Sequence, residues 1–190
     1  MKKVNAELKH ALDLMFDSPT VLDRFENTGT VSFDTAVSIG LVGVAARASG
    51  IDMDIRRDLP CGFYSHSAPA KVPVGHGDVL SRAKVRYNEI FSSLKFIEEN
   101  LKNPAGTLFA ITAEPVLQQD SMAVAVTEAW RGELCQIMIT GADGSIVQSR
   151  IVDPSFHNWF GLAMALRNEE ISNFPICNKS FNLSYCGHDL

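Results

Sequence analysis

Several features that mark common classes of protein are missing from this sequence. No apolar run approaches the roughly 18 residues that a membrane-spanning helix needs, so we expect no membrane span. Lysine and arginine total 17 against 22 aspartates and glutamates, and the net charge of -5 offers no basic surface for nucleic acid. The four cysteines form no Cys-x-x-Cys pair, which favours free thiols in a reducing compartment over a disulfide scaffold.

Signatures of stand-alone enzymes are missing as well. The sequence has no nucleophile elbow or cysteine-protease motif, and no glycine-rich strand-to-helix turn that would predict NAD binding. Neither Cys186 with His188 nor Cys61 with His66 has the spacing of half a zinc site. The basic opening is followed by no apolar stretch, so we expect no signal peptide and a cytoplasmic location. These absences argue against a secreted hydrolase or a zinc protein.

Hydrophobic periodicity predicts several helices in the first half of the chain. Residues 4–26 are typical of two helical pieces, the second beginning with a Ser-Pro pair that caps it. A third helix is expected from Ser32 as N-cap to about Ser49, and its glycines and alanines predict close approach of another backbone. Residues 52–75 combine mixed charges with three prolines, which indicates an irregular segment that serves as a contact surface.

The clearest predicted element is a long helix over about residues 77–102. Apolar residues recur along it at alternating steps of three and four, which places them in one stripe. The stripe covers only three heptads, which favours a bundle helix over a free coiled coil. If it is core throughout, replacing Leu94 by alanine costs about 2–5 kcal/mol. The stripe consists of Leu80, Ala83, Tyr87, Ile90, Leu94, Ile97 and Leu101.

The second half of the chain contains strands. Residues 124–127 and 134–139 have strand character, and Ile146 to Val152 follows a glycine-rich turn, which predicts a hairpin. Asp153 and the proline after it then predict the start of a helix. That helix is expected to bury all or some of Phe156, Phe160, Leu162 and Met164, while the tail from Phe174 to Leu190 shows no clear period.

These elements predict an α+β fold that is mainly α, a helical bundle with a long central helix and a small antiparallel hairpin or sheet. The 190 residues fit one domain. Its expected parts are an N-terminal helical part (1–27), a helical core (28–103), a small β region (104–152), and a C-terminal helix and tail (153–190).

Three stretches, taken together, resemble a known family. Their order and spacing are similar to the large catalytic subunit of energy-converting nickel-iron hydrogenases, including formate hydrogenlyase, and to the homologous hydrogenase-like subunit of complex I, the NADH-quinone oxidoreductase. The likeness runs from about residue 20 onward and implies a hydrogenase large-subunit-like fold. The stretches are residues 28–58, the run from Gly77 through Arg82 to Arg86, and residues 128–134 leading to 153–159.

The resemblance also implies where a nickel-iron centre would be held. The family uses four cysteine thiolates, and we expect this chain to begin downstream of the early pair. At the late pair, Ser184 occupies the first cysteine position and Gly187 the second. A serine hydroxyl is a hard donor that stays protonated near neutral pH, and glycine supplies no ligand. We therefore expect no metal or other cofactor in this chain, with iron-sulfur clusters in a partner subunit.

The resemblance suggests roles for two further groups of residues. Arg131 matches the arginine that hydrogenases place over the metal, although Trp130 stands where a proline is usual. It is the one candidate catalytic residue, and without a metal it would orient a loop or line a vestigial cavity. The candidate interface with another subunit or domain consists of Arg47, Asp54, Arg56, Arg57 and Asp58.

The leading hypothesis is a domain within one subunit of a hydrogenase-like or complex I-like oxidoreductase. The assembled complex would carry out electron transfer, to or from quinone, and the isolated chain would be inactive. Expected partners are an iron-sulfur small subunit and other subunits of a membrane-associated complex, with the chain peripheral on the cytoplasmic face. The alternative is a metal-free scaffold that binds partner subunits and has no redox role.

Overall fold

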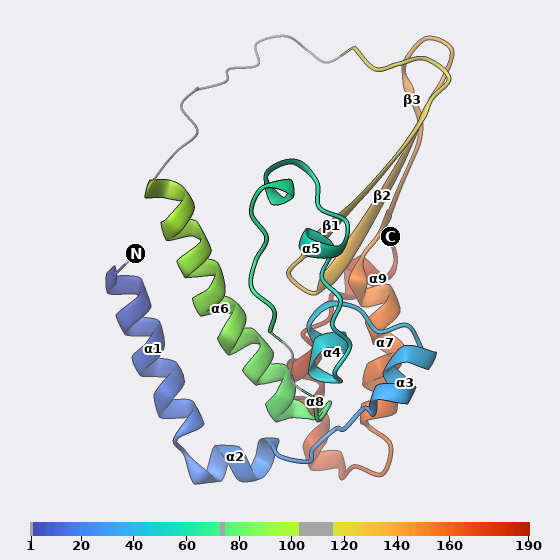
Figure 1. Ribbon diagram of the computed structural model, residues 1–190. Coiled ribbons are helices and arrows are strands. Elements are labelled where there is room, and N and C mark those ends of the chain that lie inside the picture. The colour runs from blue at the N-terminus through green and yellow to red at the C-terminus, as the bar shows by residue number, and fades with distance from the viewer. Residues whose placement is uncertain (1, 73–74, 103–115) are drawn as a thin grey trace.

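The computed structural model describes residues 2–72, 75–102 and 116–190, and its arrangement confirms the mainly helical α+β prediction (Figure 1). Two short 3-10 helices, η1 (Gly62–Ser65) and η2 (Ile171–Asn173), accompany the longer elements. The α-helices are α1 (Lys2–Phe16), α2 (Pro19–Phe25), α3 (Phe33–Ser38), α4 (Gly43–Ala48), α5 (Ile55–Asp58), α6 (Val79–Lys102), α7 (Pro154–Ala165), α8 (Phe174–Phe181) and α9 (Tyr185–His188). Among the described residues, no helix is both long and apolar enough to cross a membrane.

The strands form one antiparallel sheet in the order β1-β2-β3, with β1 at Met122–Ala129, β2 at Gly132–Thr140 and β3 at Ile146–Val152. The predicted hairpin is confirmed as the β2–β3 pair, in which Ile137 stands opposite Arg150. A second, tighter hairpin joins β1 to β2, with Ala129 opposite Gly132. Its turn, Trp130 and Arg131, therefore lies at the base of the sheet, against the helices.

The long helix α6 is confirmed, but its apolar stripe is core only at one end. Leu80 and Val85 are buried among the first two turns, where α4 and α8 pack. In the middle, Tyr87 contacts Phe16 of α1 edge to face, with ring centroids 5.3 Å apart. The last turns leave the body of the molecule, and Ile97 and Leu101 are exposed. The expectation of a continuous core stripe is therefore wrong for the last two turns.

This gradient gives a prediction for two leucines on the same helix face. Leu80→Ala removes a buried side chain and is expected to lower the free energy of unfolding by about 2–5 kcal/mol. Leu94→Ala, at a half-buried position, is expected to cost less than about 2 kcal/mol. Urea unfolding followed by circular dichroism measures both values, and equal losses would contradict the exposure gradient.

The single helix expected from Ser32 to Ser49 is wrong, because the chain forms α3 and α4 with a break between them. Ser32 caps α3 as predicted, its hydroxyl accepting from the amide of Thr35. The helix ends before Gly40, and Gly43 starts α4 with a φ of +60°. The predicted close backbone approach is confirmed there, since a Cβ on Gly43 would lie 2.2 Å from the Cα of Gly132. The two glycines pack the β1–β2 turn directly onto the start of α4.

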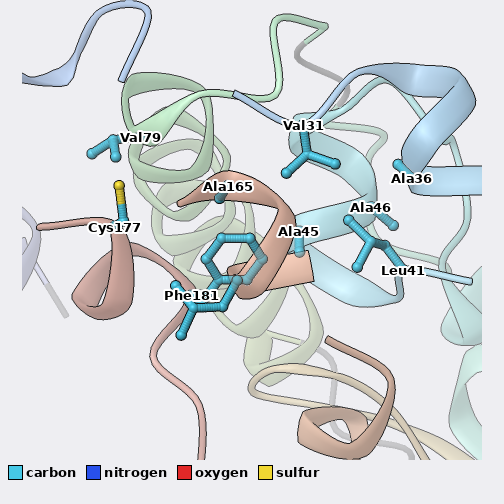
Figure 2. Close-up of a cluster of buried hydrophobic side chains, with 10 residues drawn as sticks. Val31, Ala36, Leu41, Ala45, Ala46, Val79, Ala165, Cys177 and Phe181 are labelled. Atoms are coloured by element: carbon cyan, nitrogen blue, oxygen red, sulfur yellow. The ribbon is translucent and has the colours of Figure 1, made fainter. Parts of the chain in front are cut away.

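The main core gathers segments far apart in the sequence around the start of α6 (Figure 2). The tail that showed no clear period contributes α8, which buries Cys177 and Phe181 in this core. Helix α7 starts at the predicted cap, with the Asp153 carboxylate accepting from the amide of Ser155 at 2.7 Å. Of its large apolar side chains, Leu162 is buried while Phe156 and Phe160 are exposed.

Candidate functional site

A group of buried and half-buried charged side chains joins α4, the start of α5, α6 and β1. We call it the charged cluster: Arg47, Asp54, Arg56, Glu89 and Glu128. At its centre is Arg47, which is only 4% exposed. Its Nη1 donates to Glu128 Oε1 at 2.9 Å and to the carbonyl of Met53 at 3.0 Å. Its Nε lies 2.8 Å from Glu89 Oε1, an ion pair without hydrogen-bond alignment.

The short helix α5 is held by its own charged residues. The Asp54 carboxylate caps the helix at the amide of Arg56 and also accepts from that arginine's Nε and Nη2 at 2.9 and 2.6 Å. The Asp54 amide in turn donates to Asp58 Oδ2 at 2.8 Å. Arg57 points the other way, donating to Asp52 Oδ1 at 2.8 Å and to Asp58 Oδ1 at 3.1 Å. The helix therefore has one face in the charged cluster and one charged edge toward solvent.

The charged cluster borders a cavity of about 270 Å³ between α4, α6 and the end of β1. Polar and apolar side chains both line it, and Trp130, which is 60% exposed, also faces solvent. The lining residues are Val44, Arg47, Arg56, Arg86, Glu89, Ile90, Ser93, Glu128, Ala129 and Trp130.

Two carboxyls of the charged cluster are shifted in opposite directions. Burial raises the pKa of Glu128 above its usual value and outweighs the nearby Arg47, which acts to lower it. Burial also acts to raise the pKa of Asp54, but the hydrogen bonds and charge of Arg56 outweigh it, and the pKa is lowered overall. Asp54 is therefore the firmly ionised member, and Glu128 is the one that protonates first as the pH falls.

Glu128 gives a pH-dependent prediction. A carboxyl whose pKa is raised by folding holds its proton longer in the folded state, so stability falls as pH rises from its unfolded pKa through its folded pKa. We therefore expect the unfolding free energy of wild type, minus that of Glu128→Gln, to decrease as the pH rises from about 4 to 7. Urea titrations across this range measure the difference, with Glu99→Gln correcting for the lost surface charge. A difference that grows with pH would contradict the raised pKa.

Arg131, the candidate catalytic residue, does not line this cavity. Its Nε donates to the carbonyl of Asn182, which follows α8 with a left-handed φ of 56°. Arg86 binds the two preceding carbonyls, those of Ser180 at 2.6 Å and Phe181 at 3.2 Å. Two arginines thus satisfy three successive carbonyls where α8 ends, a position that favours cations. The contacts of Arg131 are those of a residue that orients the tail.

The two predicted cysteine positions lie at the start of α9. The Ser184 hydroxyl accepts from the amide of Gly187 at 3.0 Å and caps the helix. Gly187 is buried, and a Cβ there would lie 2.6 Å from Cγ of Asp153 and under 3 Å from both its carboxylate oxygens. Any side chain at this position therefore displaces the carboxylate that caps α7. Across the described ranges 2–72, 75–102 and 116–190, no group of three or more His, Cys, Asp or Glu side chains has a metal-binding arrangement.

The structure brings together only part of the predicted interface set. Arg47, Asp54 and Arg56 meet in the charged cluster, whereas Arg57 and Asp58 lie on the solvent edge of α5. Sequence reasoning missed the acidic partners Glu89 and Glu128, which are 42 and 81 residues from Arg47. Neither glutamate has a local signal in the sequence, because acidic residues on a helix or beside a hairpin turn are mostly exposed.

Comparison with known proteins agrees with the fold. Over its full length the chain matches a solved chain of the membrane-bound sulfane sulfur reductase, an archaeal respiratory membrane complex, with a TM-score of 0.91 and 21% identity, covering 53% of that chain. It is 32% identical to the carbon monoxide-induced hydrogenase of Rhodospirillum rubrum over 87% of this chain and 45% of that protein. It is 28% identical to formate hydrogenlyase subunit 5 of Escherichia coli K12 over 97% of this chain and 32% of that protein.

These relatives, a hydrogenase and a formate hydrogenlyase subunit, confirm the resemblance to hydrogenase-like and complex I-like subunits seen in the sequence. Residues 1–122 match the family described as respiratory-chain NADH dehydrogenase, 49 Kd subunit. The chain belongs to this family. It spans about half the length, or less, of the relatives it matches.

Proposed function

We propose that this chain is the partner-binding part of a hydrogenase-like or complex I-like large subunit. The assembled complex carries out electron transfer, with quinone as donor or acceptor. The observation that carries the proposal is the family match over residues 1–122, supported by relatives that are a hydrogenase and a formate hydrogenlyase subunit.

A nickel-iron centre does not fit the residues at the late ligand positions. The hydroxyl of Ser184 already caps α9, and the carboxylate of Asp153 takes up the space where a side chain at Gly187 would begin. Nickel in such sites needs soft thiolates, and neither residue supplies one. We therefore assign no chemical step to a metal bound by this chain.

Partners and location follow from the same family. The proposed partners are an iron-sulfur small subunit and other subunits of a membrane-associated complex, with this chain peripheral on the cytoplasmic face. The solvent edge of α5 is the part of the candidate interface that a partner can reach, because Arg57 and Asp58 are partly exposed while Arg47 and Asp54 are buried. Arg57→Glu is expected to weaken co-purification of the partner.

The proposal is tested by purifying the native complex through a tag on this chain and measuring its metals and subunits. Iron together with a co-purifying iron-sulfur subunit, and no nickel, is the expected result. One nickel per complex would overturn the assignment of Ser184 and Gly187 as lost ligands. A preparation with neither metal nor partner would instead favour the scaffold function.

Restoring the two cysteines gives a prediction on the chain itself. Ser184→Cys with Gly187→Cys is expected to lower the unfolding free energy by about 2–4 kcal/mol, through overpacking against Asp153 and loss of the α7 cap. Gly187→Ala should lose a similar amount, while Gly75→Ala, whose Cβ meets nothing within 4 Å, should not. Thermal unfolding measures the losses. A double-cysteine variant that is stable and retains nickel after desalting would show that these two positions can hold the metal.

A further inference from the structure

A second cavity, of about 330 Å³, opens between α1, α2, α6 and α8, and its surface is mostly apolar. Helix α1 contributes Met15 to the lining, and α6 contributes Val79 and Ala83. The two helices lie side by side and run antiparallel (Figure 1), with the ring of Phe16 against that of Tyr87. The cavity therefore lies between the end of α1 and the beginning of α6.

The faces of α1 and α6 that line this cavity stay apolar toward the other end of the helix pair. Residues three, four or seven apart share one face of a helix, and apolar residues recur at these steps on both helices. We call the surface that they form the α1–α6 groove. It consists of Val4, Leu8, Ala11 and Met15 on α1, and of Ala83, Ile90, Leu94, Ile97 and Leu101 on α6.

The α1–α6 groove is uncovered at the end away from the cavity. Val79, beside the cavity, is only 2% exposed, whereas Val4 is 49% exposed, Ile97 45% and Leu101 65%. A helix of a globular protein normally buries its apolar face, and an exposed apolar surface of this extent marks an interaction site.

Helix α1 itself needs a further partner. Its last turns are attached to Tyr87, through the Phe16 ring and through a hydrogen bond from the tyrosine hydroxyl to Asp13 Oδ1 at 3.1 Å. The helix has 15 residues, a length at which an isolated helix is only marginally stable in water. A partner along the groove would stabilise the first turns, where Val4 is exposed.

The occupant that fits the groove is another helix. Two antiparallel helices with apolar faces on one side form part of a helical bundle, and a further helix buries both faces at once. Over its 15 residues α1 extends about 22 Å, which corresponds to a partner helix of about four turns. That helix is expected to be amphipathic, with apolar residues at alternating steps of three and four that enter the groove.

The relatives have a source for such a helix. This chain spans about half of their length or less, so each relative has a comparable or larger length of chain outside the match. We propose that the α1–α6 groove binds an amphipathic helix from that other part of the large subunit, an inference that rests on the proposed function of this chain within such a subunit.

The test introduces the photo-crosslinking residue p-benzoyl-phenylalanine at Ile97, in the groove, or at Glu99, an exposed position on the opposite side of α6. Cells that make the native complex are irradiated, the chain is purified through a tag under denaturing conditions, and linked peptides are identified by mass spectrometry. Position 97 is expected to link to an amphipathic segment of the large subunit outside residues 1–190, and position 99 several-fold less. Links from position 97 that are confined to residues 1–190, including a second copy, or that go to the iron-sulfur subunit would overturn the inference, as would equal yields at the two positions.

A charge placed in the groove supplies a second measurement. Leu101→Glu is expected to weaken the crosslink from position 97 at least about tenfold, because a carboxylate buried against an apolar helix has no partner. The melting temperature of the purified chain should not change, since Leu101 is exposed there. Lys102→Glu, which changes the charge by twice as much at the neighbouring exposed position, should leave the crosslink intact. A crosslink that persists in Leu101→Glu would contradict the assignment.

The two proposals fail in different ways. Recovery of an iron-sulfur subunit without the crosslink from position 97 contradicts the groove assignment alone. The crosslink without an iron-sulfur subunit contradicts the proposed function alone.

Discussion

Replacing Arg82 by alanine is expected to lower the free energy of unfolding by about 3–5 kcal/mol, one of the two largest single-residue effects we expect in this chain. The side chain is 1% exposed, and its guanidinium donates to the carbonyl of Gly77 at 2.7 Å, the carbonyl of Gly29 at 2.9 Å and the hydroxyl of Ser180 at 2.8 Å. It also lies 4.4 Å from the ring centroid of Phe181. The substitution removes the Arg82 donor from the buried carbonyl of Gly29, leaves the carbonyl of Gly77 only the amide of Val31, and opens a cavity beside that ring.

Urea unfolding followed by circular dichroism measures this loss. Lys84→Ala, an exposed change two residues further along α6, serves as the control and should cost less than about 0.5 kcal/mol. Arg82→Lys keeps a charge but cannot reach three acceptors in a fork, so it should recover only part of the loss. An alanine variant as stable as the lysine variant would mean that the hydrogen bonds contribute little.

Gly43→Ala is the second substitution with a large expected effect, at about 3 kcal/mol or more. The residue has a φ of +60°, and a Cβ would lie 2.2 Å from the Cα of Gly132 and 2.3 Å from the carbonyl oxygen of Arg131. Both are backbone atoms, which cannot rotate away as a side chain can. The β1–β2 turn would have to lift off α4, and Glu128 would move away from Arg47.

Gly40→Ala separates the two causes of this loss. Gly40 has a similar φ of +68°, but a Cβ there meets nothing within 4 Å. It should therefore show only the cost of the left-handed backbone, about 1 kcal/mol. Thermal unfolding of the two variants measures the difference. Equal losses would show that the close approach of Gly43 and Gly132 is not what holds the turn.

Local signals in the sequence were sufficient to predict much of the fold. The stripe from Leu80 onward predicted α6, and Asp153 before a proline predicted the start of α7, because helix period and capping act within a few residues. The break between α3 and α4 was missed because a glycine inside a helical pattern only lowers its propensity. What decides the break is the packing of Gly43 on Gly132, a contact that the sequence does not display.

The candidate site was less predictable for the same reason. The charges from Arg47 to Asp58 stood out, but the burial of Arg47 depends on Glu89 and Glu128, which reach it only in the folded chain. Arg131 was singled out by resemblance, while its contact with Asn182 requires the position of α8. That helix was missed because its eight residues are too few to establish a period, although Pro175 near its start is a common helix signal.

The composition of the core has a consequence for how the protein is made. Val31 and Leu41 emerge from the ribosome well before Cys177 and Phe181, yet the four residues pack in one cluster (Figure 2). The core cannot close until almost the whole described chain has been synthesised. Such long-range contacts also slow folding, because the entropy of closing the chain is lost before the contacts form. During translation α3 and α4 therefore wait with apolar surface uncovered, the interval in which a nascent chain most needs a chaperone.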